Sequence, residues 1–218
     1  AHDVVGAAYF PEDAQVDPKR LLRALIARAA QTGVEIRSGA TVHRVLVEGG
    51  RCAGVVLDEG ELRAEATVVA AGSWSSLVPG LPADVPVVRP ARGQMIELDE
   101  RPPRVRTIVV SPKTYVVPRG DGRVLCGSTL EFVGYRREVT AGGVHAILDG
   151  ALAAVPSLAG AELSATWSSF RPHSASDAPL MGRSTLPGLF LATGHHRNGI
   201  LLAKLTAEIV RAHILDPA

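Results

Sequence analysis

Apolar residues recur at helical spacing in three stretches of the chain. The first stretch begins after Asp17, a favourable N-cap, with Pro18 at the first helical position, and it ends at Gly33. Its apolar spacing predicts a helix with one face packed inward. Similar apolar stripes predict further helices over residues 141–155 and 200–214.

Runs typical of β-strands occupy much of the remaining chain. Glycine-containing turns at residues 49–50, 58–60 and 120–122 predict hairpins. The expected strands cover residues 34–36, 41–47, 52–57, 61–64, 92–98, 106–110, 114–117, 124–129, 164–170 and 189–192. Residues 67–71 form a further, continuously apolar run, which is typical of a strand buried on both faces. This run leads directly into Gly72, and ligand crevices open at such strand ends.

The order of these elements predicts a mixed fold, α+β with an α/β part. An antiparallel sheet with its own helix is expected between two segments in which strands lead into loops and helices. The composition changes in a proline-rich passage over residues 79–90, where a domain crossing is expected.

The composition is that of an ordinary globular protein, with 218 residues, 46% of them hydrophobic and 21% charged. The formal net charge is +1, and acidic and basic residues alternate, which argues against a nucleic-acid binder. No apolar run approaches the ~18 residues that span a bilayer, so no membrane span is expected. Cys52 and Cys126 are too few for a disulfide framework. Because the start also has no signal-peptide pattern, we expect a reducing, cytoplasmic location.

Sequence motifs of several enzyme classes are missing. The chain has no HExxH, CxxC, GxSxG or GxxxxGKS/T motif, which removes most support for a hydrolase or an NTPase. The GxGxxG dinucleotide fingerprint is also absent, because the GxG at residues 120–122 lies between two expected strands.

The segment over residues 192–203 combines a strand end, a glycine-bounded loop and an apolar helix. Junctions of this kind present free N–H groups and the positive end of a helix dipole, which suit an anion. Arg197 adds a full positive charge, although a solvated surface arginine is the alternative interpretation. His195 and His196 are adjacent and have no cluster of partner ligands, so we expect no metal site.

Two other positions carry candidate ligand-binding side chains. Arg171 follows an apolar strand beside Pro172, where a guanidinium can clamp a carboxylate with two hydrogen bonds. The alternative is that the candidate arginines form ion pairs with acids such as Glu131 or Asp177. Tyr115 lies in an alternating strand, so its hydroxyl faces either the core or a ligand.

Nine short sequences follow one another along the chain in a specific order and spacing. They are YFPE (9–12), QVDP (15–18), SGATV (38–42), VVAAGSWS (68–75), PARGQ (90–94), YVVPR (115–119), CGSTLE (126–131), FRP (170–172) and GHHRNGI (194–200). Together they resemble the FAD-dependent amine oxidoreductases of the D-amino-acid oxidase superfamily, and most of all the bacterial glycine oxidases of thiamine biosynthesis.

This resemblance implies FAD as the cofactor and a small amino acid as the substrate. It implies that Tyr115, Arg171 and Arg197 bind the substrate carboxylate and its surroundings, with no catalytic acid or base required. The residues that it places at the cofactor are Val42, Ala71, Gly72, Trp74, His196, Asn198, Gly199 and Ile200. His196 departs from the aromatic residue usual in the family, and Lys204 from a common proline.

The implied reaction is oxidation of glycine, sarcosine or a short D-amino acid to the imino acid, with oxygen as the electron acceptor. A homo-oligomer is the implied assembly. A D-amino-acid dehydrogenase with a quinone acceptor is an alternative in the same class. From other classes, the alternatives are a flavin-free remnant that binds a carboxylate or a partner protein, and one subunit of a split enzyme.

The family's N-terminal βαβ unit, which carries the GxGxxG loop, has no counterpart in this sequence. We therefore expect an incomplete, Rossmann-like FAD-binding domain with an antiparallel meander at residues 1–84, and a return to that domain at residues 164–218. Residues 85–163 are expected to form an antiparallel-sheet substrate domain. A missing N-terminal segment or a partner chain is expected to complete the protein.

The missing pyrophosphate loop generates a prediction about cofactor retention. The 218-residue chain alone should hold FAD weakly, because the charge of the diphosphate stays uncovered. Absorbance of the purified chain after gel filtration should show little bound flavin, and supplying an N-terminal GxGxxG segment should restore the yellow colour. A full, tightly held flavin complement on the chain alone would contradict this prediction.

Overall fold

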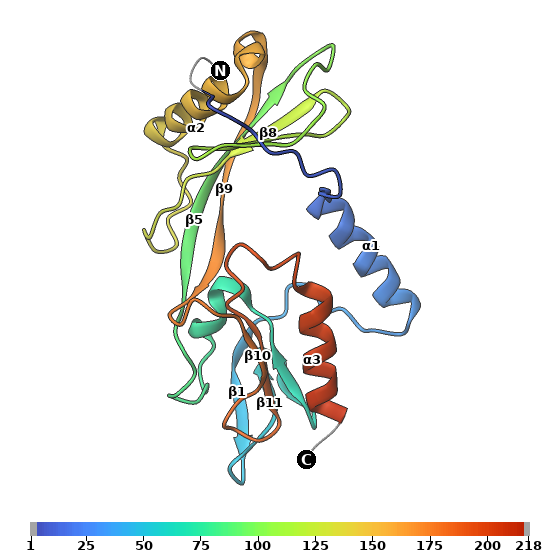
Figure 1. Cartoon of the computed structure of the whole chain (residues 1–218). Helices are drawn as coiled ribbons and strands as arrows, with labels where there is room; N and C mark the ends of the chain where they lie inside the picture. The colour runs from blue at the N-terminus through green and yellow to red at the C-terminus, as the bar shows by residue number, and fades with distance from the viewer. Residues whose placement is uncertain (1–3, 216–218) are drawn as a thin grey trace.

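The computed structural model describes residues 4–215 of the chain. Figure 1 shows two regions, one built on a five-stranded sheet and the other on two three-stranded sheets. The long antiparallel strands β5 (Val88–Asp99) and β9 (Glu162–Ser174) run side by side from the first region into the second. Helices occur together with parallel and antiparallel strand pairs, so the expected mixed α+β and α/β fold class is confirmed.

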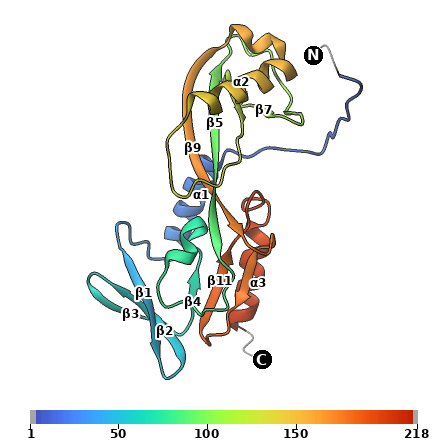
Figure 2. The same cartoon turned by 90° about the vertical axis from the view of Figure 1, so that its left-hand side faces the viewer.

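The five-stranded sheet has the order β6-β7-β8-β5-β9, and all neighbouring strands are antiparallel. Its shorter strands are β6 (Val109–Val110), β7 (Tyr115–Pro118) and β8 (Arg123–Gly127). Helix α2 (Ala141–Ala154) and the 3-10 helix η2 (Pro156–Gly160) pack against this sheet (Figure 2). The buried side chains of this core are Ile96, Leu98, Val116, Val124, Cys126, Ile147, Ala151 and Leu158.

The second region contains two small sheets that share a core. One is the antiparallel meander of β1 (Val42–Glu48), β2 (Arg51–Leu57) and β3 (Gly60–Arg63), visible in Figure 2. In the other, β4 (Thr67–Val69) runs parallel to β11 (Leu189–Thr193). The buried side chains that the two sheets share are Val45, Cys52, Val69, Leu189 and Leu191.

Glycine turns form where the sequence predicts them. Gly49 and Gly50 join β1 to β2 with φ values of 56° and 75°. A two-residue hairpin loop favours positive φ at both positions, and glycine adopts it without steric cost. A second expected turn, with Gly120 and Gly122, joins β7 to β8.

Two expectations about element positions are wrong, and one strand is not predicted by the sequence. Residues 34–36 form no strand and belong to none of the three sheets of the described residues. Strand β10 (Leu180–Arg183) is unexpected from its sequence and is stabilised by antiparallel pairing with β11. The last helix, α3 (Ala203–Leu215), begins after residue 200, because residues 199–202 form turns.

Helix α1 (Pro18–Gln31) forms at the predicted place, but the expected inward packing is wrong. Asp17 caps it by accepting hydrogen bonds from two backbone N–H groups at 3.0 and 3.1 Å. None of its residues is buried. Leu22, Leu25 and Ile26 are 58%, 56% and 47% exposed, and Figure 1 shows the helix apart from both regions.

Strand β4 is also less covered than its apolar sequence predicts. It is an edge strand that pairs with β11 on one side, and no other strand of the described part pairs with it. Val69 is buried, but Val68 is 40% exposed. The expected burial on both faces is therefore wrong for this chain.

No helix within residues 4–215 is long and apolar enough to cross a membrane. The expected domain divisions after residues 84 and 163 stay a prediction.

The uncovered apolar side chains of α1 predict self-association. Covering Leu22, Leu25 and Ile26 against a second copy removes apolar area from water, at about 25 cal/mol per Å². Sedimentation of the chain should therefore show dimers or larger species. Changing all three residues to Gln should raise the monomer fraction and leave Tm nearly unchanged, because none of them is buried. A monodisperse wild-type monomer would contradict the prediction.

Candidate functional site

One pocket brings together three side chains that the sequence singles out. It has a volume of about 160 Å³, and its lining includes Tyr115, Arg171 and Arg197. Tyr115 comes from β7, Arg171 from β9, and Arg197 from the loop between β11 and α3. Residues 110–114 and 127–130 complete the lining. The fold thus assembles the predicted substrate residues at one place, and their binding role stays a prediction.

The Arg171 guanidinium lies across β5. It donates hydrogen bonds to Ser128 Oγ at 2.5 Å and to the Thr129 carbonyl at 3.3 Å. The path across β5 is open because Gly93 has no side chain, and a Cβ there would lie 2.3 Å from Arg171 Nη1. The sequence alone assigns no role to these three supporting positions. The one available signal is a glycine inside a predicted strand, which often marks a close approach.

The Tyr115 hydroxyl lies at the pocket and not in the core. It donates a hydrogen bond to Met95 Sδ at 3.0 Å. Met95 and Gly93 are two residues apart on β5, so they face the same side of the sheet as the Arg171 guanidinium. A thioether is a weak acceptor, and the phenolic oxygen keeps its own lone pairs for a ligand.

Arg197 is exposed, but the residues before it are firmly held. His195 is buried, and its Nε2 is hydrogen-bonded to Thr206 Oγ1 of α3 at 2.8 Å. The next N–H, of His196, donates to the Pro172 carbonyl at 2.8 Å. These two contacts attach the loop to α3 and to β9, next to Arg171.

The alternative ion pairs for the pocket arginines are not formed. Glu131 pairs with Arg92, and Asp177 pairs with His173 Nε2 at 2.9 Å. Within residues 4–215, neither pocket arginine forms an ion pair with an acidic side chain. Both guanidinium charges are therefore available to an external anion.

The electrostatic character of the pocket suits a small carboxylate. Lys113 joins the two arginines in the lining, which contains no acidic side chain. Burial, followed by electrostatic interactions with His173, Arg171 and Arg197, lowers the pKa of the nearby His196. That imidazole is therefore neutral at neutral pH. A guanidinium can bind a carboxylate with two parallel charge-assisted hydrogen bonds, so this site can fix both position and orientation.

The carboxyl ends of β4 and β11 meet at the 3-10 helix η1 (Gly72–Leu77). Thr193 Oγ1 donates to the Gly72 carbonyl at 3.0 Å, and Ser75 Oγ donates to Thr193 Oγ1 at 2.7 Å. Gly72 has a φ of 55°, and a Cβ there would meet nothing within 4 Å. Because ligands of α/β sheets bind beyond the carboxyl ends of the strands, Ala71 and Gly72 fit a position beside a flavin.

The predicted loop residues at the cofactor follow the same strand end. Asn198, Gly199 and Ile200 are exposed. His196 Nε2 is buried and has no hydrogen-bond partner within the described residues. An unpartnered nitrogen at this place fits the presence of a further polar group, since buried polar atoms are almost always hydrogen-bonded.

Trp74 and Val42 have different surroundings. The Trp74 ring stacks on Tyr135 at a centroid distance of 5.8 Å and meets Phe170 edge-on at 6.0 Å. Val42 begins β1, in a different sheet from Gly72. Each of the two side chains is 43% exposed. Contact of either residue with a cofactor stays a prediction.

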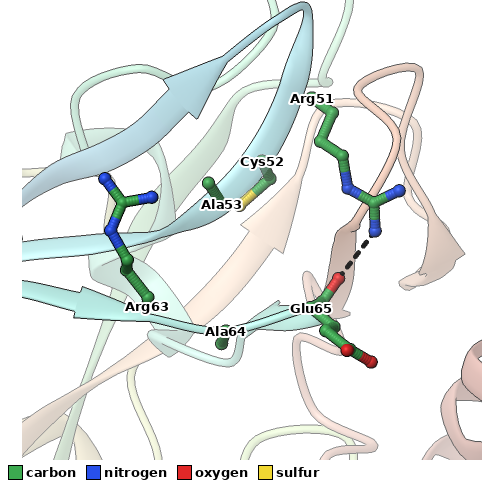
Figure 3. A pocket seen from close by; sticks show the side chains of 6 residues that line it. All are labelled: Arg51, Cys52, Ala53, Arg63, Ala64 and Glu65. Atoms are coloured by element: carbon green, nitrogen blue, oxygen red, sulfur yellow. Dashed lines mark hydrogen bonds between the residues drawn. The ribbon is translucent and has the colours of Figure 1, made fainter.

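A larger hollow, of about 590 Å³, lies at β2 and the segment that follows β3 (Figure 3). Its lining residues are Arg51, Cys52, Ala53, Arg63, Ala64 and Glu65. Arg51 donates to the Glu65 carbonyl at 3.0 Å, and Arg63 is ion-paired with Glu48 at 2.6 Å. Because its arginines already have partners and the hollow is an open surface depression, we place the candidate site at the smaller pocket.

Three known proteins are similar to this chain over nearly its whole length. The bifunctional protein ThiO/ThiG of Nostoc sp. is 38% identical, over 98% of this chain and 33% of its own length. The glycine oxidase of Pseudomonas aeruginosa is 35% identical, over 97% of this chain and 60% of its own length. The crystal structure of glycine oxidase from Geobacillus kaustophilus matches with a TM-score of 0.87 and 34% identity, over 95% of this chain and 56% of that one.

The chain thus spans between 33% and 60% of the length of these curated relatives. The sequence pattern of the FAD dependent oxidoreductase family matches residues 1–212. FAD is the cofactor of that family, and the open backbone at Gly72 and the unpartnered His196 nitrogen fit it. The chain therefore belongs to the FAD dependent oxidoreductase family.

Proposed function

We propose that the protein to which this chain belongs oxidises a small amino acid to the corresponding imino acid. Glycine, sarcosine and short D-amino acids are the proposed substrates, and oxygen is the proposed electron acceptor. The observation that carries the proposal is the pocket of about 160 Å³ lined by Tyr115, Arg171 and Arg197 without an acidic side chain. Similarity to two proteins named glycine oxidase supports the same substrate class.

Arg171 and Arg197 bind the substrate carboxylate in this proposal. Arg171 is already oriented by Ser128 and Thr129, so little conformational entropy is lost when it binds. Fixing the carboxylate also fixes the α-carbon two bonds away, and positioning of this kind contributes a large part of an enzymatic rate enhancement. The Tyr115 hydroxyl orients the bound molecule from β7.

FAD, when bound, supplies the two-electron acceptor for the Cα–H bond. The pocket lining holds no Asp, Glu or His that could remove a proton from the substrate. The substrate must therefore bind with its amine neutral, and the residues of this chain act by binding and orientation. A quinone-linked dehydrogenase remains the alternative. The test uses the whole flavin-loaded protein with glycine, sarcosine and D-alanine as substrates. Oxygen uptake and peroxide formation are compared with reduction of a quinone-analogue dye, which distinguishes oxygen from a quinone as the electron acceptor.

Removing either pocket arginine should weaken catalysis selectively. In the whole protein, Arg171→Ala or Arg197→Ala removes a charge-assisted contact worth roughly 1.5–3 kcal/mol, which lowers kcat/KM by roughly 10- to 150-fold. Lys at either position should restore part of the loss, because a point charge replaces the planar fork only partly. Tyr115→Phe should have a smaller effect. Unaltered kcat/KM for glycine, sarcosine and D-alanine in both Ala variants would contradict the proposal that the two arginines bind the substrate carboxylate.

The open path over Gly93 gives a second prediction. Gly93→Ala places a Cβ 2.3 Å from Arg171 Nη1, so the guanidinium must move, and KM for glycine should rise by about tenfold. Gly142→Ala is the matched control, because a Cβ there meets nothing within 4 Å. It should leave KM unchanged. Equal KM values in wild type and Gly93→Ala would show that the observed guanidinium position is not the one used in binding.

A further inference from the structure

A buried polar cluster lies beneath the pocket, on the opposite face of β5. Arg92 is 4% exposed and Gln94 is 1% exposed. Glu131 accepts hydrogen bonds from both: from Arg92 Nη2 and, at 2.8 Å, from Gln94 Nε2. Gln94 also joins Thr140, whose N–H donates to Gln94 Oε1 at 2.8 Å. The cluster therefore ties β5 to the segment that leads into α2.

The charge of Arg92 has several partners. Besides the Glu131 carboxylate, its Nη1 donates to the Arg136 carbonyl at 3.2 Å and to the Glu138 carbonyl at 3.0 Å. Burial raises the pKa of Glu131, but hydrogen bonds from Thr129, Arg92 and Gln94 outweigh it and leave the pKa lowered. Glu131 is therefore ionised at neutral pH, and its removal leaves a buried guanidinium without its counter-ion.

The same segment holds the Arg171 guanidinium on the pocket face. Arg92 and Glu131 exchange two backbone hydrogen bonds, at 2.8 and 3.0 Å, which align residues 128–131 along β5. Thr129 Oγ1 donates to the Glu131 carboxylate at 2.5 Å and accepts from the Gln94 N–H at 2.9 Å. The Thr129 carbonyl accepts from Arg171. One residue, Thr129, thus contacts the cluster with its side chain and Arg171 with its backbone.

We propose that Glu131 is a positioning residue that sets the place of the Arg171 guanidinium through residues 128–131. This inference rests on the proposed function, in which Arg171 binds a carboxylate. Because successive residues of a strand face opposite sides, Arg92 and Gln94 cannot reach the pocket themselves. Their effect reaches Arg171 only through the Thr129 and Ser128 groups that accept its hydrogen bonds.

The test uses Glu131→Gln in the whole flavin-loaded protein, with Glu138→Gln as the matched control on the same segment. The control side chain is 66% exposed and lies 3.9 Å from Arg92. Glu131→Gln should weaken the binding of glycolate, a carboxylate without an amine, by about tenfold in calorimetry and raise KM for glycine more than it lowers kcat. Glu138→Gln should change neither value. Wild-type glycolate binding in folded Glu131→Gln would overturn the positioning role.

A double-mutant cycle separates positioning from general stability. In an Arg171→Met background, Glu131→Gln should have no further effect on glycolate binding, because the group that it positions is gone. Additive losses would assign Glu131 a merely structural role and overturn the proposal. If Glu131→Gln does not fold, Thr129→Val provides the same test: glycolate binding about threefold weaker supports the role, and unchanged binding overturns it. If glycolate binds but glycine is not oxidised, the proposed function is rejected and the positioning role of Glu131 is not.

Discussion

The antiparallel pairing of β5 with β9 is the constraint on which the rest of the structure depends. It extends from the pair Val88 and Ser174 to the pair Asp99 and Glu162. Its register places Ala91 opposite Arg171, so the guanidinium extends along the strand toward Gly93. A slip of one residue would turn every side chain of β9 to the other face. The pocket therefore depends on strand register as much as on the identity of its arginines.

Successive side chains of β5 point to opposite faces of the sheet, and the two faces have different structural roles. Gly93 and Met95 leave room and contacts for Arg171 and Tyr115 on the pocket face. Arg92 is 4% exposed and contacts the segment that leads into α2, and an unpaired charge buried there would be strongly destabilising. The carboxylate of Glu131 and two backbone carbonyls compensate that charge. The strand can thus carry polar side chains in a buried region because the Arg92 charge and the Gln94 amide meet specific partners.

Local signals in the sequence predict several elements correctly. Asp17 and Pro18 start α1, and paired glycines close the β1–β2 hairpin, because caps and turns depend on residues that are close in sequence. Strand β10 could not be predicted in this way, since it is stabilised by pairing with β11. The exposure of Leu22 and Leu25 could not be predicted either, because it also depends on contacts between distant parts of a structure. An amphipathic pattern predicts that one face of a helix is covered but does not specify what covers it.

The candidate site could likewise be predicted from the sequence only in part. Arg171 and Arg197 are recognisable as possible carboxylate ligands from residue type and flanking loops, whereas their common pocket is a consequence of tertiary structure. Residue type does not distinguish Arg171 from Arg92, because both lie on the long paired strands β9 and β5. Their partners do. Arg92 faces a carboxylate and is neutralised, while Arg171 donates to a hydroxyl and a carbonyl, which orient it without cancelling its charge. An oriented, uncompensated guanidinium beside a small pocket is the arrangement that binds an external carboxylate, and a neutralised one beneath it is the arrangement that holds a backbone segment in place.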